Sequence, residues 1–358
     1  MIKTVKVGGS SLASAERFEN VKNIISLDCS RRAVVVSAPG KSEREKVKVT
    51  DMLISYSKAP DDEKKAAIIK RYADICASLG VTLPLDIEAS LSRPEDYNYT
   101  VSRGEYLGAC VMASYLHATF VDASDVIFFD ENGKLERERS YEAIRRAYDL
   151  SCGMIVVPGF YGRAYDGSAA LMERGGSDVT GALVAAALRA DVYENWTDVP
   201  GILRADPRVV EGASPIDTLS FPDLASLTSL GASVLHPDAV APVRELDIPI
   251  NIRSTFEPEH PGTFIRGEKP LGYAVGVTAK KGFIPFGDSD SVVLVRNDDS
   301  LSSVSVVGAS QEEYEKLLAP MRAIGALSCV YKNGDLVFTC PTDKCDDAVR
   351  ESYKILFV

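Results

Sequence analysis

Apolar positions along the first three quarters of the chain follow two patterns. Residues 33–37 form a continuous apolar run, which is typical of a strand buried on both faces of a parallel sheet. Positions 18, 21, 24 and 25 recur at helical spacing and predict a helix over 13–27. Further strand-like runs lie at 2–7, 120–122, 126–128, 154–160, 191–196 and 248–254, and helical stretches at 61–79, 102–116, 141–149, 179–190, 222–230 and 237–246. This alternation predicts an α/β layer fold with a largely parallel sheet.

The pattern changes after a segment rich in proline and glycine at 257–272, which we interpret as a linker. Ser310 and Glu313 have the spacing of a capping box, and Asn333-Gly334 is typical of a tight hairpin turn. The strands are expected at 273–279, 291–297, 302–308, 327–331, 335–340 and 353–358, and the helices after Ser310 and at 342–352. We therefore predict two domains, 1–272 and 273–358, of which the second is a small α+β domain of the ferredoxin-like kind.

Composition and charge exclude several classes of protein for this chain of 358 residues. The net charge of −11 argues against a nucleic-acid partner, which would require a basic face. No apolar run approaches the ~20 residues of a membrane span, and the N-terminus enters a strand pattern without the apolar core of a signal peptide. Seven scattered cysteines without a CxxC pair predict reduced thiols. We expect a cytoplasmic protein without a membrane or nucleic-acid partner.

The stretch Arg174-Gly175-Gly176-Ser177-Asp178 directly precedes an apolar run and has the composition of an anion site. Amides at a helix start and the helix dipole favour an anion, glycine permits close approach, and the arginine fork suits a carboxylate or phosphate. We expect Ser177 or Asp178 at the N-cap of the helix. An ordinary capped helix after a glycine-rich turn would have the same pattern.

A second glycine-rich turn, Lys6-Val7-Gly8-Gly9-Ser10-Ser11, follows the first strand. It matches neither the Walker loop nor the G-x-G-x-x-G fingerprint, but its amides and lysine can hold a phosphate. A surface turn with a solvated lysine is the alternative interpretation. Because ligands bind beyond the carboxyl ends of parallel strands, both turns are expected at the same edge of the sheet.

A third motif, Ser102-Arg103-Gly104-Glu105, is expected to begin the helix at 102–116. On a first turn, Glu105 either complements the helix dipole at the surface or points inward at an ammonium group.

Together these motifs resemble those of the aspartokinases. Lys6-Val7-Gly8-Gly9-Ser10-Ser11 is similar to their Lys-Phe-Gly-Gly-Thr-Ser, and Ser102 to Glu105 to their Ser-x-Gly-Glu. Arg174 to Asp178 is their Arg-Gly-Gly-Ser-Asp. Trp196-Thr197-Asp198-Val199-Pro200-Gly201, Asp206-Pro207-Arg208 and Leu235-His236-Pro237 resemble their nucleotide-side signature. The resemblance covers residues 2–272. It implies a three-layer amino-acid-kinase fold, with an ACT-like C-terminal domain.

The resemblance also implies an activity: transfer of the ATP γ-phosphate to the β-carboxylate of L-aspartate, the first step toward lysine, threonine and methionine. The implied catalytic residues are Lys6, which would neutralise the transferring phosphoryl group, and Asp178, which would organise Lys6. The implied substrate-binding residues are Ser37, Thr50, Glu105, Arg174, Gly175, Gly176 and Ser177. The implied nucleotide-binding residues are Lys6, Gly8, Gly9, Ser10, Thr197, Asp198, Asp206 and Arg208. Mg²⁺ would bridge the phosphates and keep mostly water ligands, so no metal-binding residues are expected. The family pattern suggests a homodimer.

Two departures from the family pattern concern nucleotide affinity and control. Ser233 replaces the lysine that is usual in Gly-Ala-Lys-Val-Leu-His-Pro, which removes one expected cationic nucleotide contact. About 86 residues follow Gly272, enough for one ACT unit instead of the usual two, and the effector turn Asn-x-Pro-Gly is absent from them. We expect feedback by lysine and threonine to be weak. Two alternatives are a kinase for another amino-acid carboxylate and a non-catalytic, amino-acid-binding regulatory homologue.

Overall fold

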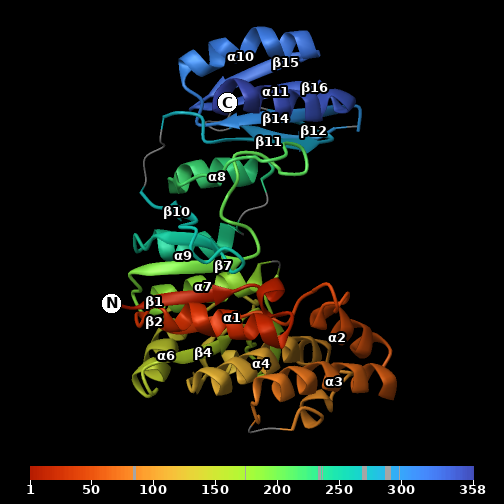
Figure 1. Cartoon of the computed structure of the whole chain (residues 1–358), viewed down its shortest axis with the longest axis vertical. Coiled ribbons are helices and arrows are strands. Elements are labelled where there is room, and N and C mark those ends of the chain that lie inside the picture. The colour runs from red at the N-terminus through yellow and green to blue at the C-terminus, as the bar shows by residue number, and fades with distance from the viewer. Residues whose placement is uncertain are drawn as a thin grey trace. The chain divides into compact units, whose positions relative to one another are not determined.

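The computed structural model describes residues 1–83, 86–173, 175–232, 235, 237–267, 272–286, 292–297 and 299–358 (Figure 1). They form two compact units. The first comprises Met1–Pro200 and Asp238–His260, and the second comprises Gly201–Pro237 and Pro261–Val358. The boundary that we expect between 272 and 273 remains a prediction, because compactness alone does not define a domain.

The first unit is built on parallel strands in the order β3-β4-β2-β1-β7-β9. The strands are β1 (Lys3–Val7), β2 (Arg31–Val36), β3 (Thr119–Phe120), β4 (Ile155–Pro158), β7 (Val192–Thr197) and β9 (Ile250–Ser254). A separate antiparallel hairpin pairs β5 (Tyr161–Arg163) with β6 (Ala169–Leu171).

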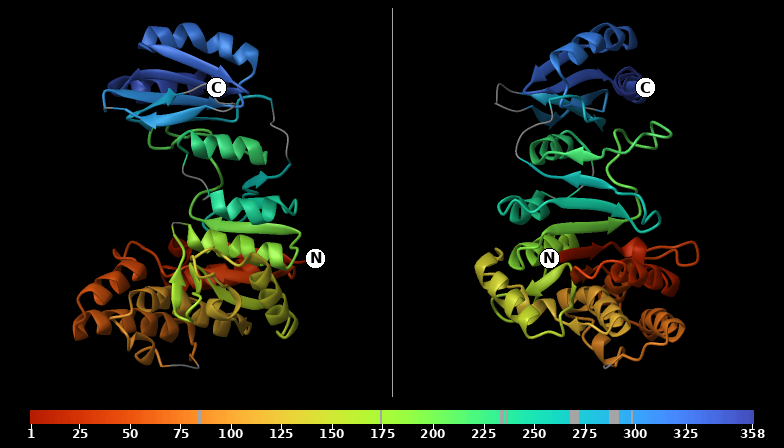
Figure 2. Two further views of the ribbon diagram at one scale, coloured as in Figure 1. Left: turned by 180° about the vertical axis from the view of Figure 1, so that it is seen from behind. Right: turned by 60° about the vertical axis from the view of Figure 1, so that its left-hand side comes forward.

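Helices cover both faces of this parallel sheet, as two further views show (Figure 2). The longer helices are α1 (Ala15–Ser26), α2 (Val49–Lys58), α3 (Asp62–Leu79), α4 (Tyr97–Leu116), α6 (Arg137–Asp149), α7 (Gly176–Ala187) and α9 (Pro237–Arg244). Shorter ones are η1 (Gly9–Leu12), η2 (Ala89–Leu91) and α5 (Ala123–Val126).

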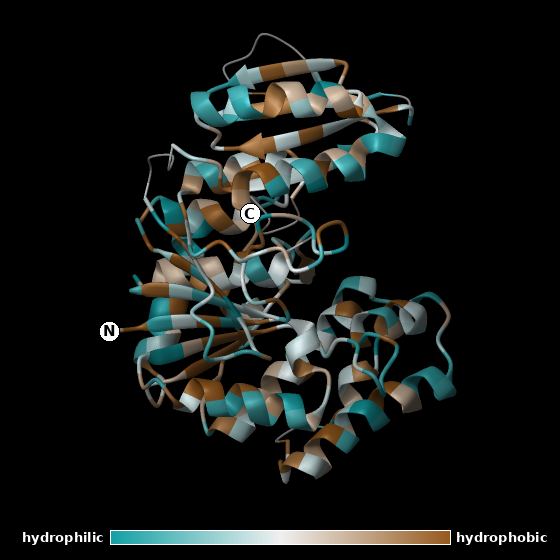
Figure 3. Cartoon of the chain, turned by 45° about the horizontal axis from the view of Figure 1, so that its top comes forward, coloured by the Kyte–Doolittle hydropathy of each residue, from teal (hydrophilic) through white to brown (hydrophobic). Residues whose placement is uncertain are grey.

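The continuous apolar run in β2 is explained by these two layers. Val34 and Val36 enter the core formed with α1 to α4, whereas Ala33 and Val35 enter the core formed with α6 and α7. Because successive side chains of a strand point to opposite faces, a strand with helices on both sides must be apolar throughout. Figure 3 shows largely apolar strands, surrounded by helices on which apolar and polar stretches alternate. The predicted three-layer α/β fold is confirmed.

The second unit contains the small α+β fold expected from the sequence. Its antiparallel sheet has the order β11-β14-β16-β15, and α10 and α11 pack on one face of it around Val304, Val306, Leu336 and Phe338. The strands are β11 (Gly276–Lys281), β14 (Leu301–Val307), β15 (Ser328–Lys332) and β16 (Asp335–Pro341). The helices are α10 (Gln311–Ile324), η3 (Thr342–Lys344) and α11 (Cys345–Phe357). The capping box of Ser310 and Glu313 and the turn at Asn333-Gly334 both form as predicted.

Three further elements complete this unit. They are a parallel pair of β8 (Thr218–Leu219) with β10 (Thr263–Ile265), the helix α8 (Phe221–Ser229), and a hairpin of β12 (Phe283–Phe286) with β13 (Val293–Arg296). The strand β10 lies inside the segment interpreted as a linker, of which residues 268–271 are outside the described ranges.

Two expected strands are wrong. Residues 123–126 form α5, because the Asp122 side chain accepts a hydrogen bond from the Ser124 amide and caps a helical turn. Residues 353–357 continue α11 instead of forming a final strand. Their apolar positions follow a helical period, and the Tyr353 and Phe357 rings lie 5.3 Å apart on one face of the helix. The strands β5, β6, β8, β10 and β12 were not expected from the sequence.

Candidate functional site

Lys6 lies at the carboxyl end of β1, opposite Asn195 of the neighbouring strand β7. Its Nζ is 2.7 Å from Oδ1 of Asp178 on α7 and donates to Asn195 Oδ1 at 3.4 Å. Asn195 Nδ2 donates in turn to the same Asp178 oxygen at 2.9 Å, so the three side chains form a closed triangle. The Lys6 and Asp178 side chains are 10% and 20% exposed. The structure therefore places a fixed, partly neutralised cation at this edge of the sheet.

The glycine-rich turn after β1 is held by close backbone contacts. The Gly8 amide donates to the Trp196 carbonyl oxygen at 2.9 Å, and the Gly40 amide donates to the Gly9 carbonyl oxygen at 2.7 Å. A Cβ added to Gly9 would lie 2.6 Å from the Ala38 carbonyl oxygen, so only glycine fits there. Because the Gly8 amide already has an acceptor, this residue shapes the turn instead of offering a free donor.

Ser37 and Thr50 border the loop that connects β2 with α2. The Ser37 amide donates to the Val7 carbonyl oxygen at 3.1 Å and extends the pairing of β1 with β2 by one residue. Thr50 is the second residue of α2, and both side chains are half-buried. These two hydroxyls thus flank the segment that folds over the Gly9 turn.

Glu105 occupies the third turn of α4, not the first turn expected from the sequence. The helix begins at Tyr97 because the Asp96 side chain accepts a hydrogen bond from the Tyr99 amide and caps it. Glu105 is 5% exposed. At the preceding residue, Gly104, an added Cβ would lie 2.8 Å from the Ala38 side chain, so α4 packs closely on the loop after β2.

The environment of the Glu105 carboxyl suits a cationic ligand. Burial raises the pKa of Glu105 to about 7. Hydrogen bonds from the Ala38 and Glu105 amides act in the opposite direction and lower the pKa, but burial has the larger effect. Its Oε2 is buried and has no hydrogen-bond partner among the residues that the structure describes. An unpaired buried carboxylate is costly, so an ammonium group bound here would relieve that cost.

The helix α7 begins one turn earlier than expected, and its N-cap is Gly175 instead of Ser177 or Asp178. Gly175 has a φ of +77°, a conformation that glycine adopts without the strain of other residues. Asp178 is therefore in the first turn, where its carboxylate reaches Lys6. Gly176 packs on Phe160, and Ser177 packs on Gly159, beyond the end of β4. Arg174 lies outside the described residues.

Four further residues expected at the nucleotide form one pair in each unit. In the first, Thr197 ends β7, and its hydroxyl donates to Asp198 Oδ1 at 3.1 Å. In the second, Arg208 Nη2 contacts Asp206 Oδ2 at 2.6 Å, and this hydrogen bond holds the pKa of Asp206 below its ordinary value. The Arg208 side chain is 88% exposed. Ser233, Val234 and His236 of the third nucleotide-side motif lie outside the described ranges.

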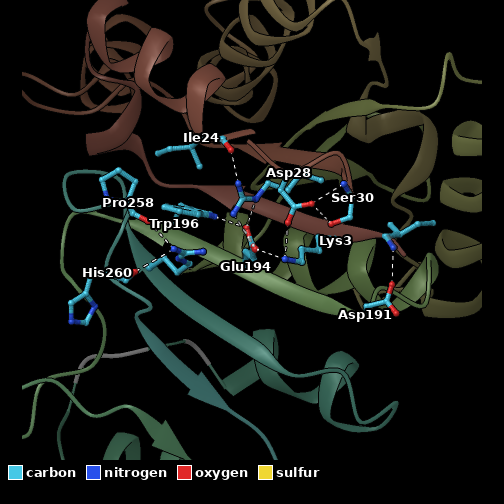
Figure 4. Close-up of polar contacts among 12 residues, drawn as sticks. Lys3, Ile24, Asp28, Ser30, Asp191, Glu194, Trp196, Pro258 and His260 are labelled. Atoms are coloured by element: carbon cyan, nitrogen blue, oxygen red, sulfur yellow. Dashed lines mark hydrogen bonds and ion pairs between the residues drawn. The ribbon is translucent and has the colours of Figure 1, made fainter. Parts of the chain in front are cut away.

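A buried polar network supports the strand that carries Asn195 and Thr197 (Figure 4). Glu194 is 1% exposed and accepts from Arg31 Nε at 2.8 Å and from Trp196 Nε1 at 2.9 Å, with Lys3 Nζ at 3.4 Å. Buried charges persist only when they are paired in this way. The network fixes the Trp196 ring directly before Thr197.

Arg253 of β9 extends this network on the other side of Trp196. Its guanidinium lies 4.5 Å from the centroid of the Trp196 ring, and its Nη2 donates to the Pro258 and His260 carbonyl oxygens at 2.7 and 3.3 Å. The sequence analysis did not identify Asn195, Glu194 or Arg253 as site residues. Adjacent polar residues in the middle of an otherwise buried strand are the signal that would have drawn attention to 194 and 195.

Among the described residues, no group of three or more His, Cys, Asp or Glu side chains is arranged to hold a metal ion. None of the helices in the described ranges is long and apolar enough to cross a membrane. All seven cysteines are free thiols.

Comparisons with known proteins identify the family of this chain. Residues 1–254 match the model of the amino acid kinase family. Aspartokinase 3 of Bacillus subtilis (strain 168) is 34% identical over 309 residues, which cover 79% of this chain and 68% of the relative. Aspartokinase 2 of the same organism is 31% identical, over 74% of this chain and 59% of the relative. The chain thus spans roughly six-tenths to two-thirds of these two relatives.

Two crystal structures are similar to the whole chain. Clostridium acetobutylicum aspartate kinase is 31% identical with a TM-score of 0.86, over 99% of both chains. E. coli aspartokinase III in complex with aspartate and ADP has a TM-score of 0.80 at 20% identity, which supports the fold alone. By these matches, the chain belongs to the amino acid kinase family. Within that family, it is a member of the aspartokinases.

Proposed function

We propose that this chain phosphorylates the β-carboxylate of L-aspartate with ATP and forms 4-phospho-L-aspartate, the first step toward lysine, threonine and methionine. Its membership of the aspartokinases supports this reaction. The observation that carries the proposal is Lys6, which Asp178 and Asn195 hold at the edge where the phosphate turn lies.

Phosphoryl transfer to a carboxylate requires positioning and charge neutralisation rather than a general base. The acceptor carboxylate is already ionised at pH 7, so Asp178 has no proton to remove. Asp178 and Asn195 instead orient Lys6, whose ammonium neutralises charge that develops on the transferring group. Gly8 and Gly9 shape the turn, and the amides of Gly9 and Ser10 are the candidate donors to phosphate oxygens.

The acceptor amino acid would bind between α4 and the start of α7. Glu105 would pair with the ammonium group, which supplies the partner that its buried oxygen lacks among the described residues. Arg174, Gly175, Gly176 and Ser177 would hold a carboxylate with a guanidinium and helix-start amides. Ser37 and Thr50 would add hydroxyl contacts from the loop on the opposite side.

The nucleotide would be held by Thr197, Asp198, Asp206 and Arg208, in addition to Lys6. When bound, Mg²⁺ would neutralise charge on the nucleotide phosphates and keep mostly water ligands, so we assign it no ligands from this chain. We propose residues 1–272 as the catalytic domain and 273–358 as an ACT-like domain.

We also propose a cytoplasmic homodimer. The seven free thiols suit a reducing compartment. The sheet edge β15 offers backbone groups that a second copy can pair with. Light scattering of the purified chain tests the dimer.

A hydroxamate assay for the acyl phosphate tests the activity directly. Purified protein is incubated with ATP, Mg²⁺ and hydroxylamine, and aspartate is compared with glutamate and other carboxylic amino acids. We expect aspartate to give the highest kcat/KM. A clear preference for another acid would identify a different acceptor. Binding of aspartate by calorimetry without turnover would identify a non-catalytic regulatory homologue.

A further inference from the structure

Arg71 of α3 belongs to none of the motifs above, yet its guanidinium is buried beside the phosphate turn. The residue is 5% exposed. Its Nη2 donates to the Ala13 carbonyl oxygen at 2.6 Å and to the Gly40 carbonyl oxygen at 3.1 Å. Ala13 directly follows η1, the helical turn of the glycine-rich segment, whereas Gly40 belongs to the loop after β2. One side chain therefore joins two segments that are distant in the sequence.

These two segments contact each other through glycine backbones. The Gly40 amide donates to the Gly9 carbonyl oxygen at 2.7 Å, and a Cβ added to Gly40 would lie 2.6 Å from the Gly9 carbonyl carbon. Neither segment has a side chain at this contact that would hold it in place. The Arg71 guanidinium supplies that restraint, because its Nη2 binds a carbonyl oxygen of each segment.

Arg71 also reaches the charged loop between the two candidate substrate hydroxyls. Its Nη1 forms an ion pair with Glu45. Glu45 lies in the loop 41–48, which connects the segment after Ser37 with the α2 residue Thr50. The Val49 amide donates to the Pro39 carbonyl oxygen at 3.0 Å and closes the base of the loop. Glu45 is half-exposed, so the ion pair can open without unfolding the protein.

We propose that Arg71 is a positioning residue that sets the distance between the Gly9 turn and the Gly40 loop, and that Glu45 latches the loop 41–48 onto it. Through the first contact, Arg71 aligns the amides of the phosphate turn. Through the second, the latch holds the loop that leads into α2 and its residue Thr50. The kinetic consequence rests on the proposed aspartate kinase activity, but the latch itself does not.

Three variants separate the two roles. Arg71→Met removes both carbonyl contacts and should lower kcat about 10²-fold, since a small misplacement of reacting groups has an effect of that order. Arg71→Lys keeps the charge without the fork and should restore part of kcat. Glu45→Gln breaks only the latch. The aspartate KM should rise about fivefold, which corresponds to the free energy that a partly exposed ion pair contributes. The ATP KM should stay unchanged.

Matched controls lie beside each residue. Lys70→Gln removes a neighbouring cation on the exposed face of α3, and Glu43→Gln removes an exposed carboxylate from the same loop. Both should behave like the parent. If Arg71→Met does not fold, Glu45→Gln still tests the latch, because a half-exposed loop residue is not needed for the core.

Trypsin gives a readout of the latch that does not depend on activity. The loop offers exposed cleavage sites at Lys41, Arg44, Lys46 and Lys48. Glu45→Gln should be cut there several-fold faster than Glu43→Gln. Equal cleavage rates, together with an unchanged aspartate KM, would overturn the latch, and parent-like kcat in Arg71→Met would overturn the positioning role. A parent without acyl phosphate formation but with the expected cleavage difference would reject only the proposed function.

Discussion

The position of Lys6 is fixed by its contacts with Asp178 and Asn195 and by the hydrogen bond between those two side chains. Asp178 balances its charge, and Asn195 prevents the ammonium and carboxylate from rotating independently, because the amide binds both. A lysine on a flexible stem is thereby given a defined location. We expect this triangle to matter for rate far more than for stability.

The variant Lys6→Ala should therefore lose turnover while retaining its fold. Removal of a cation that stabilises the phosphoryl transition state should lower kcat on the order of 10² to 10³-fold or more. The hydroxamate assay measures the rate, and circular dichroism verifies the fold. Turnover within about tenfold of the parent would remove Lys6 from the phosphoryl site. Lys70, an exposed lysine of α3, provides a control at which substitution should leave kcat nearly unchanged.

Glu105 makes the ligand-free protein sensitive to pH. Its carboxyl has a folded-state pKa of about 7, above the ordinary 4.5, so the protonated form favours folding. That stabilisation is complete below pH 4.5 and is lost as the pH rises through about 7. The melting temperature of the parent should fall over this window relative to Glu105→Gln, which cannot titrate. Parallel melting curves for the two proteins would show that Glu105 is ionised throughout.

The same titration should affect aspartate binding in the opposite direction. Only the ionised carboxylate pairs with an ammonium group, so the aspartate KM of the parent should fall as the pH rises through about 7. Glu105→Gln should weaken aspartate binding by roughly 2–5 kcal/mol at high pH and leave the ATP KM unchanged. A rise in the ATP KM instead would place Glu105 on the nucleotide side.

At the scale of elements, the capping box before α10 gives the clearest prediction. The Ser310 hydroxyl accepts from the Glu313 amide at 3.3 Å, and the Glu313 carboxylate accepts from the Ser310 amide at 2.7 Å and from the Ala274 amide at 3.1 Å. Ser310→Ala should lower the free energy of unfolding by about 1 kcal/mol. Urea denaturation measures it, with the exposed Ser328→Ala as control. Equal losses in both variants would mean that the cap contributes nothing specific.

The sequence predicted most elements because their signals are local. Helical spacing located α1 and α3, and the Asn333-Gly334 turn located the β15–β16 hairpin. The predictions failed where a short apolar run had no period long enough to distinguish strand from helix, as at 126–128 and 353–358. The starts of α4 and α7 were predicted too late in the sequence. Asp96, which caps α4, lies outside the recognised motifs. Gly175, which caps α7, lies inside a recognised motif, but the cap was expected at Ser177 or Asp178.

The sequence also predicted part of the candidate site. Topology predicted that the two glycine-rich turns, after β1 and before α7, lie at one sheet edge, and the structure brings Lys6 and Asp178 together there. The contribution of Arg71 could not be predicted, because a lone arginine in an amphipathic helix is usually a solvated residue. Its two carbonyl acceptors come from separate segments that only the folded chain brings together.

At the scale of the whole molecule, the core of the second unit lets us predict the outcome of a truncation. Leu203, Ala205, Val209, Val210 and Ala213 pack into the same core as the C-terminal sheet and helices. Ser214 and Arg204 are hydrogen-bonded to Tyr353 and Val277. A protein that ends at residue 272 would expose this apolar surface, so we expect it to aggregate.

Size-exclusion chromatography with light scattering checks this truncation against the full chain. Tyr353→Phe is the mild control, since it loses only the hydroxyl bonded to the Ser214 amide, at a cost of about 1 kcal/mol. A truncated protein that remains monodisperse, with kinetics like those of the parent, would show that residues 201–237 need no support from the C-terminal elements.

The pairing of β1 with β7 has one more consequence. Lys6 and Asn195 face each other because the register of these strands pairs Lys3 with Val192 and continues without interruption to Val7 and Trp196. A slip by one residue would turn one of the two side chains to the opposite face of the sheet. Such a misaligned molecule would have no triangle around its ammonium and could not turn over substrate. The activity recovered after refolding would therefore measure the fraction of molecules in which β1 and β7 pair in the native register. Neither circular dichroism nor molecular mass distinguishes these molecules from misaligned ones.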